Sequence, residues 1–281
     1  MRKILLATTS LVAVSVTAAQ ADVSISGSYE FGYYQTSAGT NSTGSDGNIT
    51  FSGTGASENG VTYSVVANNG IQTGSVEDAY LQMAGDFGTL RLGFTDSMVD
   101  TNDGVLGKSQ FVYGMNDIST EIEMDTGGVN DETVAAFHYQ SAELVPGLTA
   151  YGSVIPNGVT GYGIKYSNDL ATVIYQIAGG GGTDQTLVGV GFNVGGFGIN
   201  AGSLESTTAA VKTTTSDFAV SYSFGDIGIV AGQIKQGAKS YDSVGATYTI
   251  APGVGLVVEN YANDDGTTET SGTGAWLTVS F

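Results

Sequence analysis

The chain has 281 residues, no cysteine and a formal net charge of −19. A surface this acidic repels nucleic acid and anionic lipid headgroups and attracts cations, which excludes nucleic-acid binding. With 41% hydrophobic residues the chain is too apolar to be disordered, and without cysteine it must fold without disulfides.

The first 21 residues have the three parts of a secretory signal peptide. Arg2 and Lys3 are basic, residues 4–16 are mostly apolar, and Ala19-Gln20-Ala21 is a small-x-small cleavage site. The apolar run is shorter than the about 20 residues that a membrane-spanning helix needs. We therefore expect residues 1–21 to be removed and the mature chain, residues 22–281, to begin at Asp22.

Apolar and polar residues alternate along most of the mature chain, which predicts strands. The pattern gives about 16 segments of roughly 10 residues, an even number as in bacterial outer-membrane barrels. In the segments around Tyr151 and Ile229 both faces are apolar, so the alternation leaves their direction open. The first and last segments are the clearest, with Val23, Ile25, Tyr29, Phe31 and Tyr33, and then Ala275, Leu277, Val279 and Phe281, on the apolar face.

Short and long connections alternate between these segments. Turn sequences such as Glu58-Asn59-Gly60, Pro146-Gly147 and Gly195-Gly196 alternate with longer polar stretches at 36–46, 68–75, 179–184, 205–213 and 263–272. Short turns at one rim and long loops at the other are typical of outer-membrane barrels. The sequence therefore predicts an all-β protein, a transmembrane antiparallel β-barrel of the Gram-negative outer membrane with apolar side chains facing lipid.

One connection is much longer than the others. Residues 95–132 show no sustained alternation, and a loop of this length is usually functional. We treat 96–132 as a candidate constriction loop. It carries the acidic residues Asp96, Asp100, Asp103, Asp117, Glu121, Glu123, Asp125, Asp131 and Glu132, and the single cation Lys108.

Two stretches resemble the general (non-specific) porin family of Gram-negative outer membranes. Residues 76–93, Val-Glu-Asp-Ala-Tyr-Leu-Gln-Met-Ala-Gly-Asp-Phe-Gly-Thr-Leu-Arg-Leu-Gly, look like the fourth strand, tight turn and fifth strand of that family. The strand that ends in Phe281 resembles the family's assembly signal, which the outer-membrane insertion machinery reads. The resemblance implies a 16-stranded barrel, usually a homotrimer, whose long third loop folds into the lumen.

The resemblance also implies that the acids of this loop face a basic cluster on the barrel wall. This sequence departs from the pattern, because Arg91 and Lys165 are the lumen-facing cations that alternation places. Alternation also puts Glu30, His138, Glu259 and the single Trp276 on the lumen wall. We expect the constriction to be formed by Arg91, Lys165 and the loop acids.

The expected function is a water-filled pore for passive diffusion of small hydrophilic solutes and ions, with a preference for cations. One alternative is a substrate-specific channel, which an aromatic ladder along the lumen would distinguish. Another is a secreted β-rich adhesin or structural protein. The chain is not expected to be an enzyme, because it has a single histidine, His138, and no Gly-x-Ser-x-Gly nucleophile elbow that would supply a catalytic serine.

No cofactor is expected, and one histidine without cysteine argues against zinc. A Ca²⁺ site formed by Asp100, Asp103, Glu121 and Glu123 is a further hypothesis, since oxygen ligands suit Ca²⁺, although their spacing does not match an EF-hand.

Overall fold

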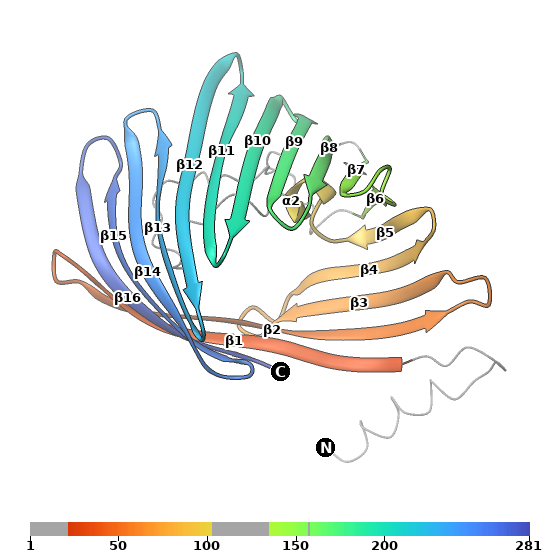
Figure 1. Cartoon of the computed structure of the whole chain (residues 1–281), viewed down its shortest axis with the longest axis horizontal. Helices are drawn as coiled ribbons and strands as arrows, with labels where there is room; N and C mark the ends of the chain where they lie inside the picture. The colour runs from red at the N-terminus through yellow and green to blue at the C-terminus, as the bar shows by residue number, and fades with distance from the viewer. Residues whose placement is uncertain (1–21, 103–134, 157) are drawn as a thin grey trace.

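The computed structural model describes residues 22–102, 135–156 and 158–281 (Figure 1). Sixteen strands form one closed antiparallel barrel in which each strand pairs with its neighbours in the chain. This confirms the predicted fold class. The strands are β1 (Asp22–Thr36), β2 (Asn41–Ala56), β3 (Thr62–Gly70), β4 (Val76–Gly85), β5 (Gly88–Phe94), β6 (Ala136–Ser141), β7 (Leu148–Val154), β8 (Thr160–Ser167), β9 (Ala171–Gly180), β10 (Thr183–Val194), β11 (Phe197–Thr208), β12 (Val211–Phe224), β13 (Ile227–Gln236), β14 (Lys239–Ala251), β15 (Val254–Asp264) and β16 (Glu269–Ser280).

The alternating sequence places apolar side chains on the outer face of the barrel. Val23 and Ile25 of β1 are 64% and 60% exposed, and Leu277 and Val279 of β16 are 45% and 38% exposed. Their neighbours in the sequence point to the inner face, where Trp276 is only 4% exposed. Exposed apolar side chains around a closed sheet fit a lipid surface, because lipid and not water then covers them.

The barrel closes by pairing its first strand with its last. β1 and β16 are in register from Ser28↔Ser280 to Thr36↔Gly272. The chain end extends this seam, because Gly27 and Phe281 exchange backbone hydrogen bonds of 3.1 and 3.0 Å. The ring of Phe281 lies over Gly27, where a Cβ atom would come within 2.9 Å of it. Closure leaves no strand edge that would lack hydrogen-bond partners in lipid.

Several polar stretches that the sequence analysis assigned to loops are strand in the structure. β2 already begins at Asn41, and β11 and β12 are joined by Ala209 and Ala210 alone. Serine and threonine side chains pair across these strands, as in the 2.9 Å contact between Thr183 Oγ1 and Thr208 Oγ1. Threonine is β-branched and favours strands, so these polar stretches extend the sheet beyond the apolar band. The loop prediction was wrong there because polarity was read as irregular structure.

The wall is lowest at β5–β8, which have 7, 6, 7 and 8 residues, whereas β2 has 16. The same sector carries the one helix among the described residues, α2 (Met98–Thr101), which follows β5. Figure 1 shows α2 inside the barrel, beside β7–β9. No helix among the described residues is long and apolar enough to cross a membrane.

Candidate functional site: the inner wall of the barrel

The inner wall holds polar, aromatic and aliphatic side chains that the strand alternation turns away from lipid. Neighbours in the sequence have opposite exposure: Phe137 is 59% exposed while His138 is fully buried, and Phe218 is 51% exposed while Asp217 is 3% exposed. Tyr151, whose direction the sequence left open, points inward and is 4% exposed. Other buried polar side chains of the inner wall are Ser153, Gln176, Thr215, Ser243, Glu259 and Asn263.

The long connection after β5 begins on this inner wall. Ser97 caps the short helix α2, because its hydroxyl accepts a hydrogen bond from the Asp100 amide at 3.3 Å. Asn102 ends the helix, with its side-chain amide donating to the Met98 carbonyl at 2.9 Å and to Gln140 Oε1 of β6 at 3.3 Å. Asp96 and Asp100 are thereby held within the barrel.

Three strands hold α2 against the wall. The Met98 amide donates to Ser153 Oγ of β7 at 2.6 Å, and Gln176 Nε2 of β9 donates to the Val99 carbonyl at 2.7 Å. Between these two contacts the wall provides a glycine, Gly161 of β8. A Cβ atom at that position would lie 2.9 Å from the Val99 side chain. The start of the predicted constriction loop therefore packs on the inner face of β7–β9.

Arg91 of β5 lies on the inner face and is fixed by β4. Its Nε donates to Gln82 Oε1 at 2.8 Å, and its guanidinium carbon lies 5.4 Å from the centre of the Tyr80 ring. Its register partner on β6 is His138. The lone histidine is fully buried, and its Nδ1 lies 2.8 Å from Ser153 Oγ. Arg91 and His138 therefore belong to the sector that carries α2.

Lys165 of β8 also lies on the inner face, between the outward-facing Ile164 and Tyr166, and is half-buried. The structure thus places the predicted lumen cations Arg91 and Lys165 in the same low sector, β5–β8. They do not meet on one strand pair, since β6 and β7 lie between their strands.

Carboxylates lie in other sectors of the wall. Glu30 of β1 is the register partner of Asp46 of β2, and both are half-buried on the inner face. Further along the wall, Asn68 of β3 donates to Asp78 of β4 at 3.3 Å. Asp46 was missed because it was assigned to a loop. Its separation of five residues from the outward-facing Phe51, an odd number, is a usable signal that it faces inward.

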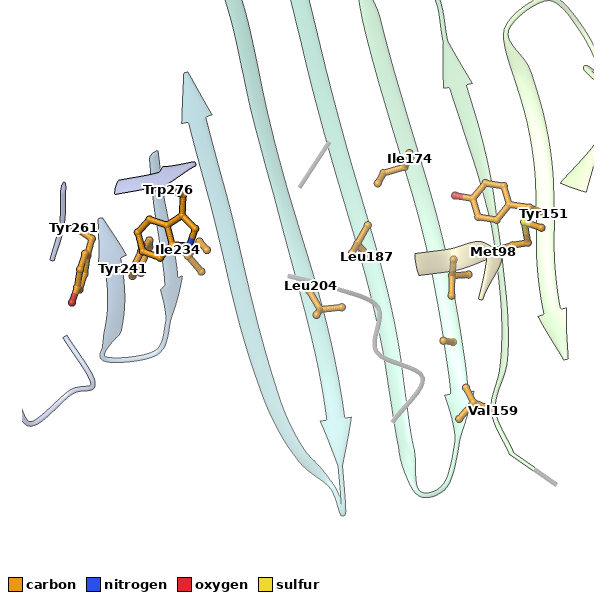
Figure 2. Close-up of a cluster of buried hydrophobic side chains, with 12 residues drawn as sticks. Met98, Tyr151, Val159, Ile174, Leu187, Leu204, Ile234, Tyr241, Tyr261 and Trp276 are labelled. Carbon is orange, nitrogen blue, oxygen red and sulfur yellow. The ribbon is translucent and has the colours of Figure 1, made fainter. Parts of the chain in front are cut away.

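A row of aromatic side chains crosses the inner wall of β14, β15, β16 and β1. We call Tyr241, Tyr261, Trp276 and Tyr34 the aromatic row. Figure 2 shows Tyr241, Tyr261 and Trp276 together at one end of a band of buried side chains that continues through Leu204, Leu187 and Ile174. Glu259, predicted on the lumen wall, is 1% exposed and accepts a hydrogen bond from the Tyr241 hydroxyl at 2.9 Å.

Several predicted residues lie outside the described part of the chain. These are the signal peptide, residues 1–21, and Asp103, Lys108, Asp117, Glu121, Glu123, Asp125, Asp131 and Glu132 of the long loop. Within residues 22–102, 135–156 and 158–281, no three His, Asp or Glu side chains are grouped as metal ligands.

Comparison with known proteins gives both a family and a fold. The family model described as Gram-negative porin matches residues 7–280. No curated protein sequence matches the chain.

Solved structures of outer-membrane proteins share the barrel. A loop-deletion mutant of OmpT, an outer membrane protein of Vibrio cholerae, has a TM-score of 0.76 at 11% identity, covering 93% of this chain and 99% of that one. An anion-selective porin from Comamonas acidovorans has a TM-score of 0.71 at 13% identity, covering 93% and 100%. A triple mutant of the Rhodopseudomonas blastica porin has a TM-score of 0.68 at 18% identity, covering 92% and 100%. Because the family model spans nearly the whole chain and the closed 16-stranded barrel agrees with it, the protein belongs to the Gram-negative porins, the channel-forming barrels of the outer membrane.

Proposed function

We propose that the protein is a passive, water-filled pore for small hydrophilic solutes and ions and that it prefers cations. The observation that supports this preference is the distribution of charge on the inner wall. Carboxylates face inward from β1, β2, β4, β12 and β15. The inward-facing Arg91 and Lys165 belong to the sector β5–β8, and Lys239, which has the same inward parity as Tyr241, lies at the turn end of β14. Of the carboxylates, Glu30, Asp46 and Asp78 are half-buried, whereas Asp217 and Glu259 are 3% and 1% exposed.

A pore wall of this kind raises the local concentration of cations. The barrel wall has a low dielectric constant, so the field of its carboxylates is directed into the aqueous lumen. Rings and clusters of acidic side chains select cations in channels in the same way. The acids of the long loop, Asp96 and Asp100 together with those at 103–132, are proposed to add to this negative potential as the constriction.

The remaining expectations belong to the same proposal. Residues 1–21 are proposed to be the signal peptide, and the barrel is proposed to assemble as a homotrimer, as porins with this fold commonly do. The terminal Phe281 is proposed to be read by the insertion machinery.

Reversal potentials across a KCl gradient in planar bilayers test the cation preference. We expect the reversal potential at low salt to have the sign that indicates preferential K⁺ permeation. Its size should decrease in about 1 M KCl, where the screening length is only about 3 Å. Replacing Glu30 and Asp46 together by Gln and Asn should lower the permeability ratio of K⁺ to Cl⁻. A preference of the unmodified protein for Cl⁻ would refute the proposal.

The matched control is Asp184→Asn. Asp184 is exposed on β10 and has the position parity opposite to the inward-facing Leu187, so it lies on the outer face. This variant changes the net charge of the chain without changing the inner wall. An equal loss of selectivity in the control would show that overall charge, and not the inner wall, sets the preference.

A further inference from the structure

One stacked pair of the aromatic row crosses the seam where the barrel closes, and a second pair lies on the next two strands. Tyr34 of β1 and Trp276 of β16 stack with their centres 6.2 Å apart and an angle of 6° between their planes. Tyr241 of β14 and Tyr261 of β15 stack at 5.9 Å and 15°. The four strands are direct neighbours in the barrel. The rings thus form two stacked pairs on four neighbouring strands of the inner wall.

Glycines on the adjacent strands allow these rings to lie flat. Gly32 is the register partner of Trp276, and a Cβ atom there would lie 2.2 Å from the indole ring. Gly272 is the register partner of Tyr261, and a Cβ atom there would lie 2.8 Å from the phenol ring. The Trp276 and Tyr261 rings therefore each cover a glycine with one face.

Hydrogen-bond acceptors lie beside the rings. Glu259 Oε1 accepts from the Tyr241 hydroxyl at 2.9 Å. Asn263, the register partner of Tyr241, is 2% exposed, and among the described residues its side-chain oxygen has no hydrogen-bond partner. A buried acceptor without a donor is unfavourable, so the Asn263 oxygen indicates a donor supplied by a ligand.

We propose that the aromatic row, with Glu259 and Asn263, is a binding site for small alkylammonium ions that pass through the pore. The ring faces attract a cation by their quadrupoles, and this attraction is stronger at a desolvated site such as this one. Glu259 supplies the opposite charge, and the Asn263 oxygen accepts a hydrogen bond from the ammonium group. Tyr34, the half-buried member of the row, is the end from which a solute enters.

This inference deepens the proposed function, because it depends on a pore that admits cations and names one class of cation that is retained in it. Neutral sugars are the other class of solute that stacks on aromatic rings. The carboxylate favours the ammonium ion over a sugar, and the experiment includes both.

Trp276 is the only tryptophan of the chain and lies in the row, so its fluorescence reports binding directly. The purified barrel in neutral detergent is titrated with n-butylammonium chloride, with KCl at equal ionic strength, and with glucose. We expect a saturable change in Trp276 emission with n-butylammonium alone. No saturable change, an equal change with KCl, or saturation by glucose instead would each overturn the proposal.

Two variants and one control locate the site. Tyr34→Leu and Glu259→Gln should each weaken n-butylammonium binding about tenfold, the effect of removing one cation contact at a desolvated site. Tyr33→Leu is the control, because Tyr33 is the neighbour of Tyr34 in β1 and is exposed on the outer face. Equal weakening in all three variants, or none in the first two, would contradict the assignment of the site.

The titration in detergent requires no ion flow, so its result is independent of the reversal potentials. Saturable binding without K⁺ preference would refute the proposed selectivity and retain the site. K⁺ preference without binding would do the opposite.

Discussion

Ser153 joins two parts of the chain that are far apart in the sequence. Its hydroxyl accepts the Met98 amide at the start of α2 and also contacts the buried His138 ring. With one proton to donate and two lone pairs, a serine hydroxyl can serve both partners at once. The position of the long connection on the wall therefore depends on a side chain in β7, a segment whose facing direction the sequence pattern left open.

We expect Ser153→Ala to destabilise the barrel by about 1–3 kcal/mol, because the Met98 amide would remain buried without an acceptor. The measurement is the free energy of unfolding from urea titration in detergent micelles. The control is Ser167→Ala, which removes a half-buried hydroxyl contact to Thr172 at 2.9 Å and should cost less. An equal loss in both variants would show that the contact to α2 adds no stability.

Asp265 stabilises the turn between β15 and β16, outside the membrane-spanning strands. Hydrogen bonds from the Thr267 hydroxyl, and then from the Thr268 and Thr267 amides, hold the pKa of its carboxyl below the usual value. Because the folded pKa is depressed, this stabilisation is present above the unfolded pKa of about 3.9 and is lost as pH falls through the folded pKa.

We therefore expect the Thr267 and Thr268 amides to lose protection from hydrogen exchange, relative to their intrinsic rates, as pH falls below about 4. Asp265→Asn should show reduced protection already at neutral pH. Protection that stays constant down to pH 2 would contradict the role of the carboxylate.

At the scale of the element, strand number and facing direction could be predicted because the period of two is a local property of the backbone. The inward positions of Arg91, Glu30, His138 and Trp276 follow from it directly. Tyr151 could not be assigned, since its segment is apolar on both faces and only the packing of α2 distinguishes them. The aromatic row could not be predicted either, because it depends on the register between four strands.

Strand ends were the least predictable feature, as the turn after β11 shows. Ala209 and Ala210 both have positive φ, 48° and 67°, as required at the centre of a type I′ turn. Alanine is a poor residue for this conformation, and the sequence gives no turn signal there. The equivalent turn after β10 has Gly195 and Gly196 at φ 58° and 86°.

Replacing Ala209 by Asn and Ala210 by Gly should stabilise this hairpin by about 1 kcal/mol or more, because both residues adopt positive φ with less strain. The thermal unfolding midpoint of the barrel in detergent measures the gain. The reverse change at the other turn, Gly195→Ala with Gly196→Ala, serves as the control and should lower the midpoint. A lower midpoint in the Asn-Gly variant would contradict the argument.

At the scale of the whole molecule, the barrel depends on one seam between its ends. The pairing of β1 with β16 supplies hydrogen bonds that no other part of the chain can replace, and the backbone of Phe281 extends it. An open edge in lipid would leave backbone groups without partners, so closure and insertion are expected to occur together.

Deleting Phe281 should lower the fraction of chains that reach the closed, membrane-inserted state. That fraction is measured as the heat-modifiable band on a detergent gel of outer membranes. Phe224→Leu, which changes an outward-facing aromatic residue beside a short turn, is the control and should leave assembly unchanged. An undiminished band in the deletion variant would exclude Phe281 as an assembly signal.

The low wall at β5–β8 has a consequence for the surrounding bilayer. Six to eight residues span only about 20–27 Å along a strand, and less along the membrane normal once the strand is tilted, whereas outer-membrane barrels usually present an apolar band about 25 Å tall. Acyl chains that border these strands must therefore compress, or a neighbouring protein must replace them. The barrel is thus hydrophobically matched to its membrane on one side and mismatched on the other, a difference that favours association through the short side.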